Sequence, residues 1–142
     1  MTQNISEPTT GEYEAINFDG LEHGDKAQCY NLRQHIIASE RRNLPATLTI
    51  EQWCTTVNYF RGKCAYCQVR DFEVLEHFIP HRHGGGTTAD NCVPACRICN
   101  GLKSSHLPSD IPRSSRYRQI RWSILRVQEY LTTCGSEATA AS

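Results

Sequence analysis

The sequence lacks the features that direct a chain into or across a membrane. No stretch near its start joins a basic segment to an apolar one, as a secretory signal would. No run reaches the roughly 18 apolar residues that span a bilayer, and no internal repeat is visible. We therefore expect a soluble cytoplasmic protein without a membrane partner. A chain of 142 residues suits one domain with one modest core.

The chain also lacks a net charge, because 15 Lys and Arg residues balance 15 Asp and Glu residues. The charges are unevenly distributed, however. Residues 1–60 carry four basic and eight acidic side chains, whereas residues 61–126 carry eleven basic and five acidic ones. A basic middle segment is typical of proteins that neutralise phosphates, although charged runs are often only solvated surface. The pattern favours a nucleic-acid partner weakly.

Cysteine is the residue type that says most about this chain. Eight cysteines could indicate a secreted disulfide scaffold, but no secretory signal precedes them, and four fall in two CxxC pairs, Cys64/Cys67 and Cys96/Cys99. Two thiolates on each tight turn can point at one tetrahedral ion, so we predict a four-cysteine Zn²⁺ site. A closed shell leaves no open position, so this zinc is expected to stabilise the fold rather than to catalyse. We expect the other four cysteines to be free thiols: Cys29, Cys54, Cys92 and Cys134.

Hydrophobic periodicity predicts helices on both sides of the cysteine pairs. A polar helix is expected over 31–43, a helix with a capping box at Thr49 over 50–61, and a long amphipathic helix over 114–133. The aromatic residues of the second helix are interpreted as core rather than as a base-stacking surface.

The middle of the chain is expected to contain little regular structure. Val74 to Pro80 has the composition of a strand and leads into a glycine-rich loop without periodicity. From Asn91 we expect a short turn, and from Cys96 to Ser104 a short helix.

The most specific pattern lies in this middle region. An acid–histidine pair, Glu76-His77, is followed by the glycines 84–86, by Asn91 and by Asn100, which directly follows Cys99. Over about residues 64–104 this run resembles the HNH endonuclease motif. The zinc-bearing members of that family place an acid–His pair at a strand end, then a glycine loop, an Asn, and a CxxC followed by His or Asn.

The resemblance implies an α+β fold with a small zinc-stapled ββα-metal core (an HNH or His-Me finger) and flanking helices. It also implies an endonuclease that hydrolyses DNA phosphodiester bonds. In this interpretation the chain has four segments. They are an acidic, loosely ordered segment (1–30), N-terminal helices (31–62), the ββα-metal core (63–106), and a C-terminal amphipathic helix with a tail (107–142).

The resemblance assigns a role to each motif residue. His77 matches the first His and is the expected general base, because a neutral imidazole can accept a proton near pH 7. Glu76 and Asn100 match positions whose hard oxygen ligands suit a catalytic Mg²⁺ or Mn²⁺. Asn91 matches the middle Asn and is expected to orient His77, since an amide cannot act as a base.

The sequence departs from the family pattern in three places. Glu76 stands where Asp is commoner, Asn100 closes the motif where the family name implies His, and Cys92 replaces the usual aliphatic residue after Asn91. The first two changes favour Mg²⁺ or Mn²⁺ over zinc at the catalytic position.

Several residues are candidates for contact with the nucleic-acid backbone. They are Arg82, His83, Lys103, Arg118 and Arg126. The two arginines of the last helix lie opposite its apolar stripe, where they serve solubility equally well. We expect His81 to be an exposed loop side chain, whereas His83 is a secondary candidate for touching phosphate or supporting the metal. The glycines are expected to bend the loop sharply and to allow close approach to a phosphate.

Two alternatives to a free-standing nuclease stay open. A degenerate HNH domain can keep its zinc and bind nucleic acid without cutting it. The chain can also act as a subunit of a larger nuclease assembly, and dimerisation through the C-terminal helix is a further hypothesis.

Overall fold

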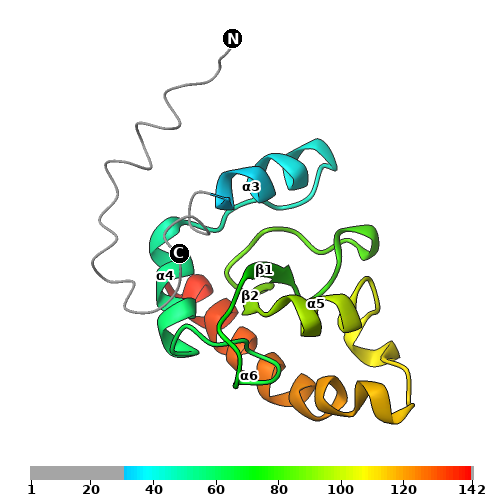
Figure 1. Ribbon diagram of the computed structural model, residues 1–142. Coiled ribbons are helices and arrows are strands. Elements are labelled where there is room, and N and C mark those ends of the chain that lie inside the picture. The colour runs from blue at the N-terminus through cyan, green and yellow to red at the C-terminus, as the bar shows by residue number, and fades with distance from the viewer. Residues whose placement is uncertain (1–30, 142) are drawn as a thin grey trace.

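The structure is a computed structural model that describes residues 31–141 of the chain, and it describes side chains as far as residue 134. The segment 1–30, expected to be loosely ordered, lies outside the described residues, as does Cys29. Within the described range the fold mixes helices with one small sheet (Figure 1). This is the α+β class that the sequence predicts.

Two helices precede the cysteine pairs. Helix α3 (Leu32–Arg41) and helix α4 (Ile50–Tyr59) agree with the predicted segments, and each ends two residues earlier than expected. Helix α4 begins at a capping box. The Thr49 hydroxyl accepts a hydrogen bond from the Gln52 backbone N–H at 3.1 Å, and the Gln52 amide oxygen accepts one from the Thr49 N–H at 2.9 Å.

The sheet consists of two antiparallel strands. Strand β1 (Val74–His77) pairs with strand β2 (Cys92–Ala95), so that His77 lies opposite Cys92 at one end of the ladder. The turn expected after Asn91 is therefore a strand, and the prediction was wrong at this point. Pro94 hides it in the sequence, because proline cannot donate to a ladder and usually argues against a strand. A two-stranded sheet tolerates it because each strand has a free edge.

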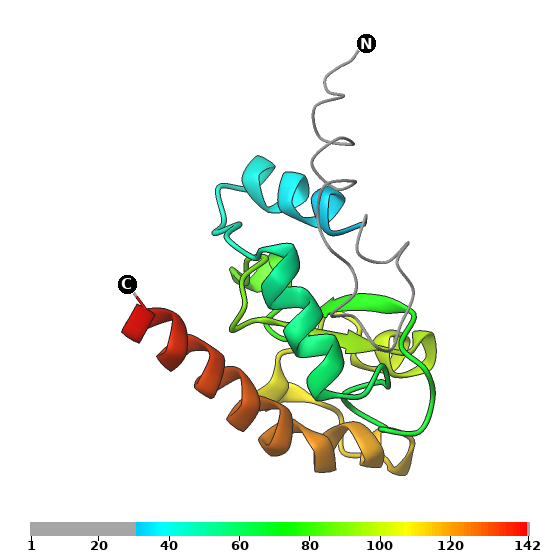
Figure 2. The same ribbon diagram turned by 90° about the vertical axis from the view of Figure 1, so that its left-hand side faces the viewer.

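Helix α5 (Arg97–Lys103) follows β2 and completes a ββα unit. It packs against β1, while α4 packs against β2. Figure 2 shows α4 crossing in front of the sheet with α6 beneath it. In this arrangement β1, which carries Glu76 and His77, lies between β2 and α5.

The long helix α6 (Arg118–Ala141) begins four residues later than predicted and extends further. Its stripe Ile120, Ile124, Val127 and Leu131 is buried in an apolar cluster that includes three of the four CxxC cysteines. A second cluster joins α3, α4 and β1 around Trp53, which is fully buried. None of the described helices is long and apolar enough to span a bilayer.

The capping box at the start of α4 provides the first test. Thr49→Ala removes the acceptor for the Gln52 N–H, so the free energy of unfolding should fall by about 1 kcal/mol. The matched control is Thr55→Ala in the same helix, where an exposed hydroxyl bonds only to the Glu51 carbonyl. Denaturant unfolding of both variants measures the difference, and equal losses would contradict the role of the cap.

Candidate active site and metal centre

The four CxxC cysteines meet at one point. The Sγ atoms of Cys64, Cys67, Cys96 and Cys99 all lie within 4.8 Å of one another. The first pair lies on the turn before β1, and the second lies at the start of α5, where Cys96 is the N-cap. A set of four converging thiols is the donor set of a structural zinc site, so the residues fit the metal.

The backbone around these thiols favours their ionised form. The N–H groups of Cys67 and Arg70 donate to Sγ of Cys64 and Cys67 respectively, both at 3.5 Å, and the Cys99 N–H donates to the Cys96 sulfur at 3.4 Å. A hydrogen bond from the Cys99 thiol lowers the pKa of Cys64 to about 5. The same hydrogen bond, together with burial, raises the pKa of Cys99, so binding of a metal ion must displace the proton that the two sulfurs share.

Helix α6 holds the first cysteine turn, and this corrects the expectation for Arg126. Its guanidinium donates to the carbonyl oxygens of Ala65 at 2.7 Å and Tyr66 at 3.1 Å, so it points inward and is not placed to grip nucleic acid. Arg118 does lie on the exposed face of α6, with its guanidinium carbon 5.7 Å from the centroid of the exposed Trp122 ring.

Lys103, predicted to contact phosphate, is fully buried. Its ammonium donates to a carboxylate oxygen of Glu76 at 2.8 Å and to the backbone carbonyl oxygens of His77 at 3.2 Å and Phe78 at 2.7 Å. Because the side chain has no exposed surface, it cannot reach a nucleic-acid backbone, and this expectation was wrong. Lysine at this position instead fastens the end of α5 to the end of β1.

Glu76 is the partner of Lys103 rather than an open metal ligand. One carboxylate oxygen accepts from the Tyr66 hydroxyl and the other pairs with Lys103, and the residue is only 3% exposed. Burial raises the pKa of Glu76, and the charge of Lys103 opposes that rise. A cation could reach this carboxylate only by displacing Lys103, so Glu76 does not fit the expected Mg²⁺ or Mn²⁺ role in this arrangement. Asn100, the other expected ligand, is half-buried on α5.

His77, at the end of β1, lies in a group of three histidines. Its ring centroid is 4.2 Å from that of His81 and 5.4 Å from that of His35. Burial, followed by the neighbouring His81 and His35, lowers the pKa of His77 to about 3. The imidazole is therefore neutral near pH 7 and keeps the lone pair that a proton acceptor needs.

Two of these histidines were misjudged or missed in the sequence. His81, expected to be an exposed loop side chain, is half-buried, and its Nε2 lies 2.9 Å from the Ser39 hydroxyl. His35 and Ser39 come from α3, outside the motif. Their spacing of four residues, which puts them on one face of a helix, is the only signal that the sequence offers.

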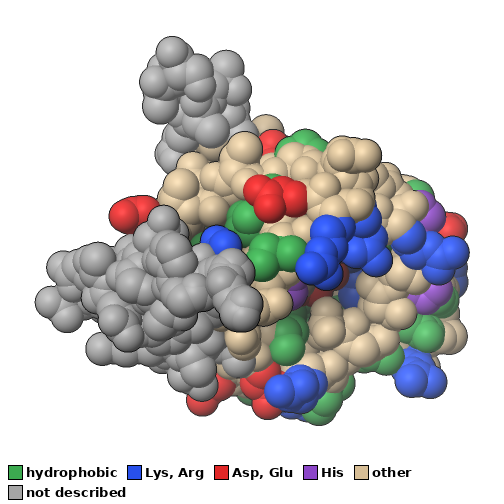
Figure 3. All heavy atoms as spheres, turned by 90° about the horizontal axis from the view of Figure 1, so that it is seen from above, with side chains coloured by type: hydrophobic (Ala, Val, Ile, Leu, Met, Phe, Trp, Pro, Cys, Tyr) green, Lys and Arg blue, Asp and Glu red, His purple; other side chains and the backbone are tan. Residues whose placement is uncertain are grey.

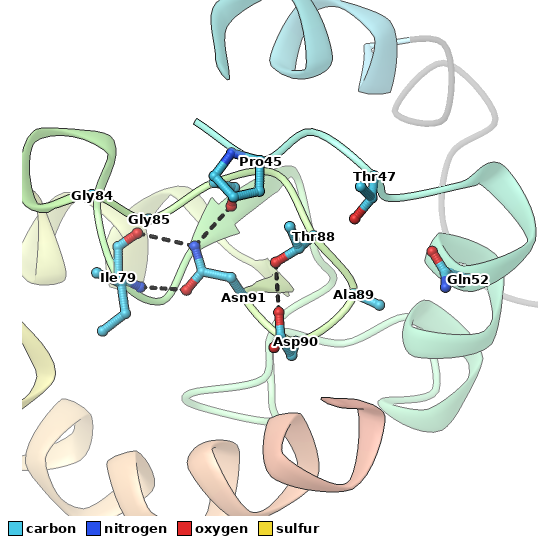
Figure 4. A pocket seen from close by; sticks show the side chains of 11 residues that line it. Pro45, Thr47, Gln52, Ile79, Gly84, Gly85, Thr88, Ala89, Asp90 and Asn91 are labelled. Atoms are coloured by element: carbon cyan, nitrogen blue, oxygen red, sulfur yellow. Dashed lines mark hydrogen bonds between the residues drawn. The ribbon is translucent and has the colours of Figure 1, made fainter. Parts of the chain in front are cut away.

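Asn91 closes the loop between the two strands. Its amide oxygen accepts from the Ile79 N–H at 2.8 Å, and its amide nitrogen donates to the carbonyl oxygens of Ile79 at 3.0 Å and Gly86 at 2.8 Å (Figure 4). The side chain is nearly buried. Asn91 thus fixes the backbone that leaves β1 two residues after His77.

The glycines allow this loop to pack closely on the protein itself. A Cβ atom on Gly85 would lie 1.7 Å from the Ile79 carbonyl oxygen, and one on Gly86 would lie 2.2 Å from that of Pro45. Both residues are buried and lie close to neighbouring backbone. The expectation that these glycines approach a phosphate was therefore wrong for Gly85 and Gly86. A pocket of about 540 Å³ opens beside Asn91 and the loop, between residues 84–91 and the start of α4.

The remaining backbone-contact candidates lie on the surface. Arg82 and His83 are exposed on a short 3₁₀ helix (His81–His83), where Arg82 donates to the Ser105 hydroxyl at 3.3 Å. Figure 3 shows Lys and Arg side chains along one side of a hollow in which histidine is visible. This face offers positive charge beside imidazole groups.

Comparisons with known proteins match the segment that carries the cysteine cluster and His77. Residues 64–106 match the family model described as HNH endonuclease. A protein named "SPbeta prophage-derived putative HNH endonuclease YoqL", from Bacillus subtilis (strain 168), is 27% identical over 121 residues. The alignment covers 75% of this chain and 50% of that protein, so the chain spans about half the length of its relative. No solved structure gives a significant match.

The cysteine cluster predicts tight zinc binding. Cys64→Ser should abolish binding of the roughly one zinc ion per chain and should lower the melting temperature strongly, because the ion joins two distant turns. Elemental analysis and thermal unfolding measure the two effects. The matched control is Cys54→Ala, which removes a buried thiol of α4 outside the cluster and should keep the zinc. Zinc retained at full stoichiometry by Cys64→Ser would refute the assignment.

The buried ion pair predicts strong coupling between its two residues. Lys103→Met leaves the Glu76 carboxylate buried without its cation, so the free energy of unfolding should fall by about 3–5 kcal/mol. Adding Glu76→Gln should restore part of that loss, since a neutral amide needs no counter-charge. Denaturant unfolding of the two single variants and the double variant, all loaded with zinc, completes the cycle. Strictly additive losses would show that the pair is not coupled.

Proposed function

Because residues 64–106 form a domain of the HNH endonuclease family, we propose that the chain is an endonuclease that hydrolyses DNA phosphodiester bonds. The observation that supports this most is His77, a neutral imidazole at the strand end of a ββα unit. In the proposal His77 is the general base and the four cysteines hold a structural Zn²⁺. Asn91 orients the strand end that carries His77.

The proposed chemistry requires a water molecule to lose a proton as it attacks phosphorus. His77 can accept that proton on the imidazole nitrogen that carries no hydrogen; burial lowers its pKa, which keeps the ring neutral at pH 7 and also weakens it as a base. Arg82 and His83, exposed on the turn that follows, and Arg118 on α6 are the candidates that remain for binding phosphate oxygens. Backbone contacts of this kind position a duplex without reading its sequence.

A divalent cation, Mg²⁺ or Mn²⁺, is part of the proposal, and when bound it would offset the negative charge that grows on the phosphate. Of the two expected ligands, the Asn100 side-chain carbonyl remains a candidate. Glu76 does not fit, because Lys103 and Tyr66 occupy its carboxylate. We therefore assign no step to a cation held by Glu76.

The same observation favours a second candidate function. If Lys103 permanently neutralises Glu76, the domain lacks the acidic ligand that the motif supplies and binds DNA without cutting it. The basic residues and the zinc centre would serve such a binding module equally well. Whether the chain works alone, as a homodimer or in a larger assembly is a separate proposal that either function allows.

A plasmid-nicking assay distinguishes the two functions. Zinc-loaded protein is incubated with supercoiled plasmid in the presence of Mg²⁺, Mn²⁺ or EDTA, and zinc content is measured afterwards to exclude loss of the structural metal. We expect cleavage only with added Mg²⁺ or Mn²⁺, and we expect His77→Ala to reduce its rate by at least about 100-fold, because the proton acceptor is gone.

The matched control for that substitution is His106→Ala, which removes an imidazole outside the histidine group. It should cut like the unaltered chain, and fluorescence anisotropy should show that all three proteins bind DNA. If none of them cuts duplex, single-stranded DNA or RNA while all still bind, the binding module is the better account.

A further inference from the structure

A series of hydrogen bonds through two buried hydroxyl groups joins α3 to His77. The Thr87 hydroxyl lies 2.9 Å from His77 Nε2 and 2.7 Å from the Ser39 hydroxyl, and the latter lies 2.9 Å from His81 Nε2. Ser39 and Thr87 are both fully buried, so water cannot take the place of a missing partner. The direction of each hydrogen bond is therefore set by the groups themselves.

One end of this series is a backbone carbonyl, which can only accept a hydrogen bond. The Thr87 hydroxyl donates its single proton to the carbonyl oxygen of His35 at 3.1 Å. Thr87 has no second proton to give, so in its bond with Ser39 the serine hydroxyl must be the donor. By the same reasoning, the His77 Nε2 atom must carry a proton and donate it to Thr87.

The next bond follows in the same way. Ser39 has given its only proton to Thr87, so it accepts from His81, whose Nε2 must also carry a proton. If the donor and acceptor of each bond were reversed, the Thr87 and His35 oxygen atoms would lie 3.1 Å apart with no proton between them. Such a contact is unfavourable in a buried site.

We propose that Thr87 is a positioning residue that holds His77 in its Nε2–H tautomer, leaving Nδ1 as the atom that accepts the proton from water. Ser39 holds the Nε2–H tautomer of His81 in the same way. The role of Nδ1 in cleavage rests on the proposed nuclease function, whereas the tautomer does not. Ser39 and the His35 carbonyl belong to α3, outside the matched residues 64–106. A helix beyond the HNH segment thus selects the reactive nitrogen.

Nuclear magnetic resonance reads the tautomer directly. In zinc-loaded full-length protein labelled with ¹⁵N-histidine, long-range proton–nitrogen correlations distinguish an imidazole protonated at Nε2 from one protonated at Nδ1. The His77 signals are assigned by their loss in His77→Ala. We expect Nε2–H at His77 and at His81 in the unaltered chain.

Thr87→Val removes the hydroxyl while keeping the shape of the side chain. It should release His77 into a mixture of tautomers, and Thr87→Ser should restore the Nε2–H form. In the plasmid assay Thr87→Val should lower kcat by about 10- to 100-fold with little change in KM, and Thr87→Ser should recover most of it. The neighbouring Thr88→Val, whose hydroxyl bonds only to Asp90, is the matched control and should change neither readout.

Each outcome decides the proposal. His77 protonated at Nδ1 in the unaltered chain, or a tautomer unchanged by Thr87→Val, would overturn it. If Thr87→Val fails to fold, the tautomer of His77 in the unaltered chain still decides the proposal, because it is read without any substitution. An Nε2–H tautomer in a protein that cuts no nucleic acid would support the positioning role of Thr87 and reject the nuclease function.

Discussion

The buried ammonium of Lys103 is the contact on which the geometry of the site depends. It joins the last residue of α5 to the Glu76 carboxylate and to the two carbonyls at which β1 ends, those of His77 and Phe78. A buried cation with three oxygen partners holds its neighbours firmly, because any separation leaves charge without solvent or a partner. The position of His77 follows from the position of these carbonyls.

The four-cysteine centre anchors the opposite end of α5. Cys96 and Cys99 lie at its first turn and Lys103 at its last, so this helix of seven residues is fastened at both ends. Asn91 fastens the backbone just beyond His77, through three hydrogen bonds to the loop. Short elements like these gain little stability from their own hydrogen bonds. The cysteine centre, the Lys103 contacts and the Asn91 hydrogen bonds therefore fix the site, a role that a large core has in bigger proteins.

The imidazole of His77 is set by contacts that come from beyond this unit. The ring lies beside His35 and His81, and its Nε2 meets Thr87, which is itself bonded to α3. Burial among these groups keeps the ring neutral. The ββα unit therefore supplies the histidine, while α3 and the glycine loop determine its state.

Local patterns in the sequence predicted the parts of the fold that depend on neighbours along the chain. The capping box at Thr49, the apolar stripe of α6 and the two CxxC turns are all visible within a few residues, and the structure has all three. Strand β2 was missed because a proline such as Pro94 is uncommon within a strand, and the sequence does not show that β1 pairs with this segment.

The environment of the site could not be predicted in this way. Lys103 and Arg126 look like surface cations in the sequence, and only tertiary packing shows that each ends on buried or half-buried oxygen acceptors. The meeting of His35 with His77 joins positions more than forty residues apart. Such contacts depend on which face of a helix meets its neighbour, and the sequence does not state this.

Hydrolysis in water enriched with ¹⁸O tests the central claim most directly. Zinc-loaded protein is incubated with a short DNA duplex and Mg²⁺ or Mn²⁺ in this water, and the masses of the products are measured by mass spectrometry. Each new terminal phosphate should carry a single ¹⁸O atom from solvent, and His77→Ala should form these labelled products at least about 100-fold more slowly, because the proton acceptor is gone. Products without the label, or DNA that stays intact with every cation, would contradict the account.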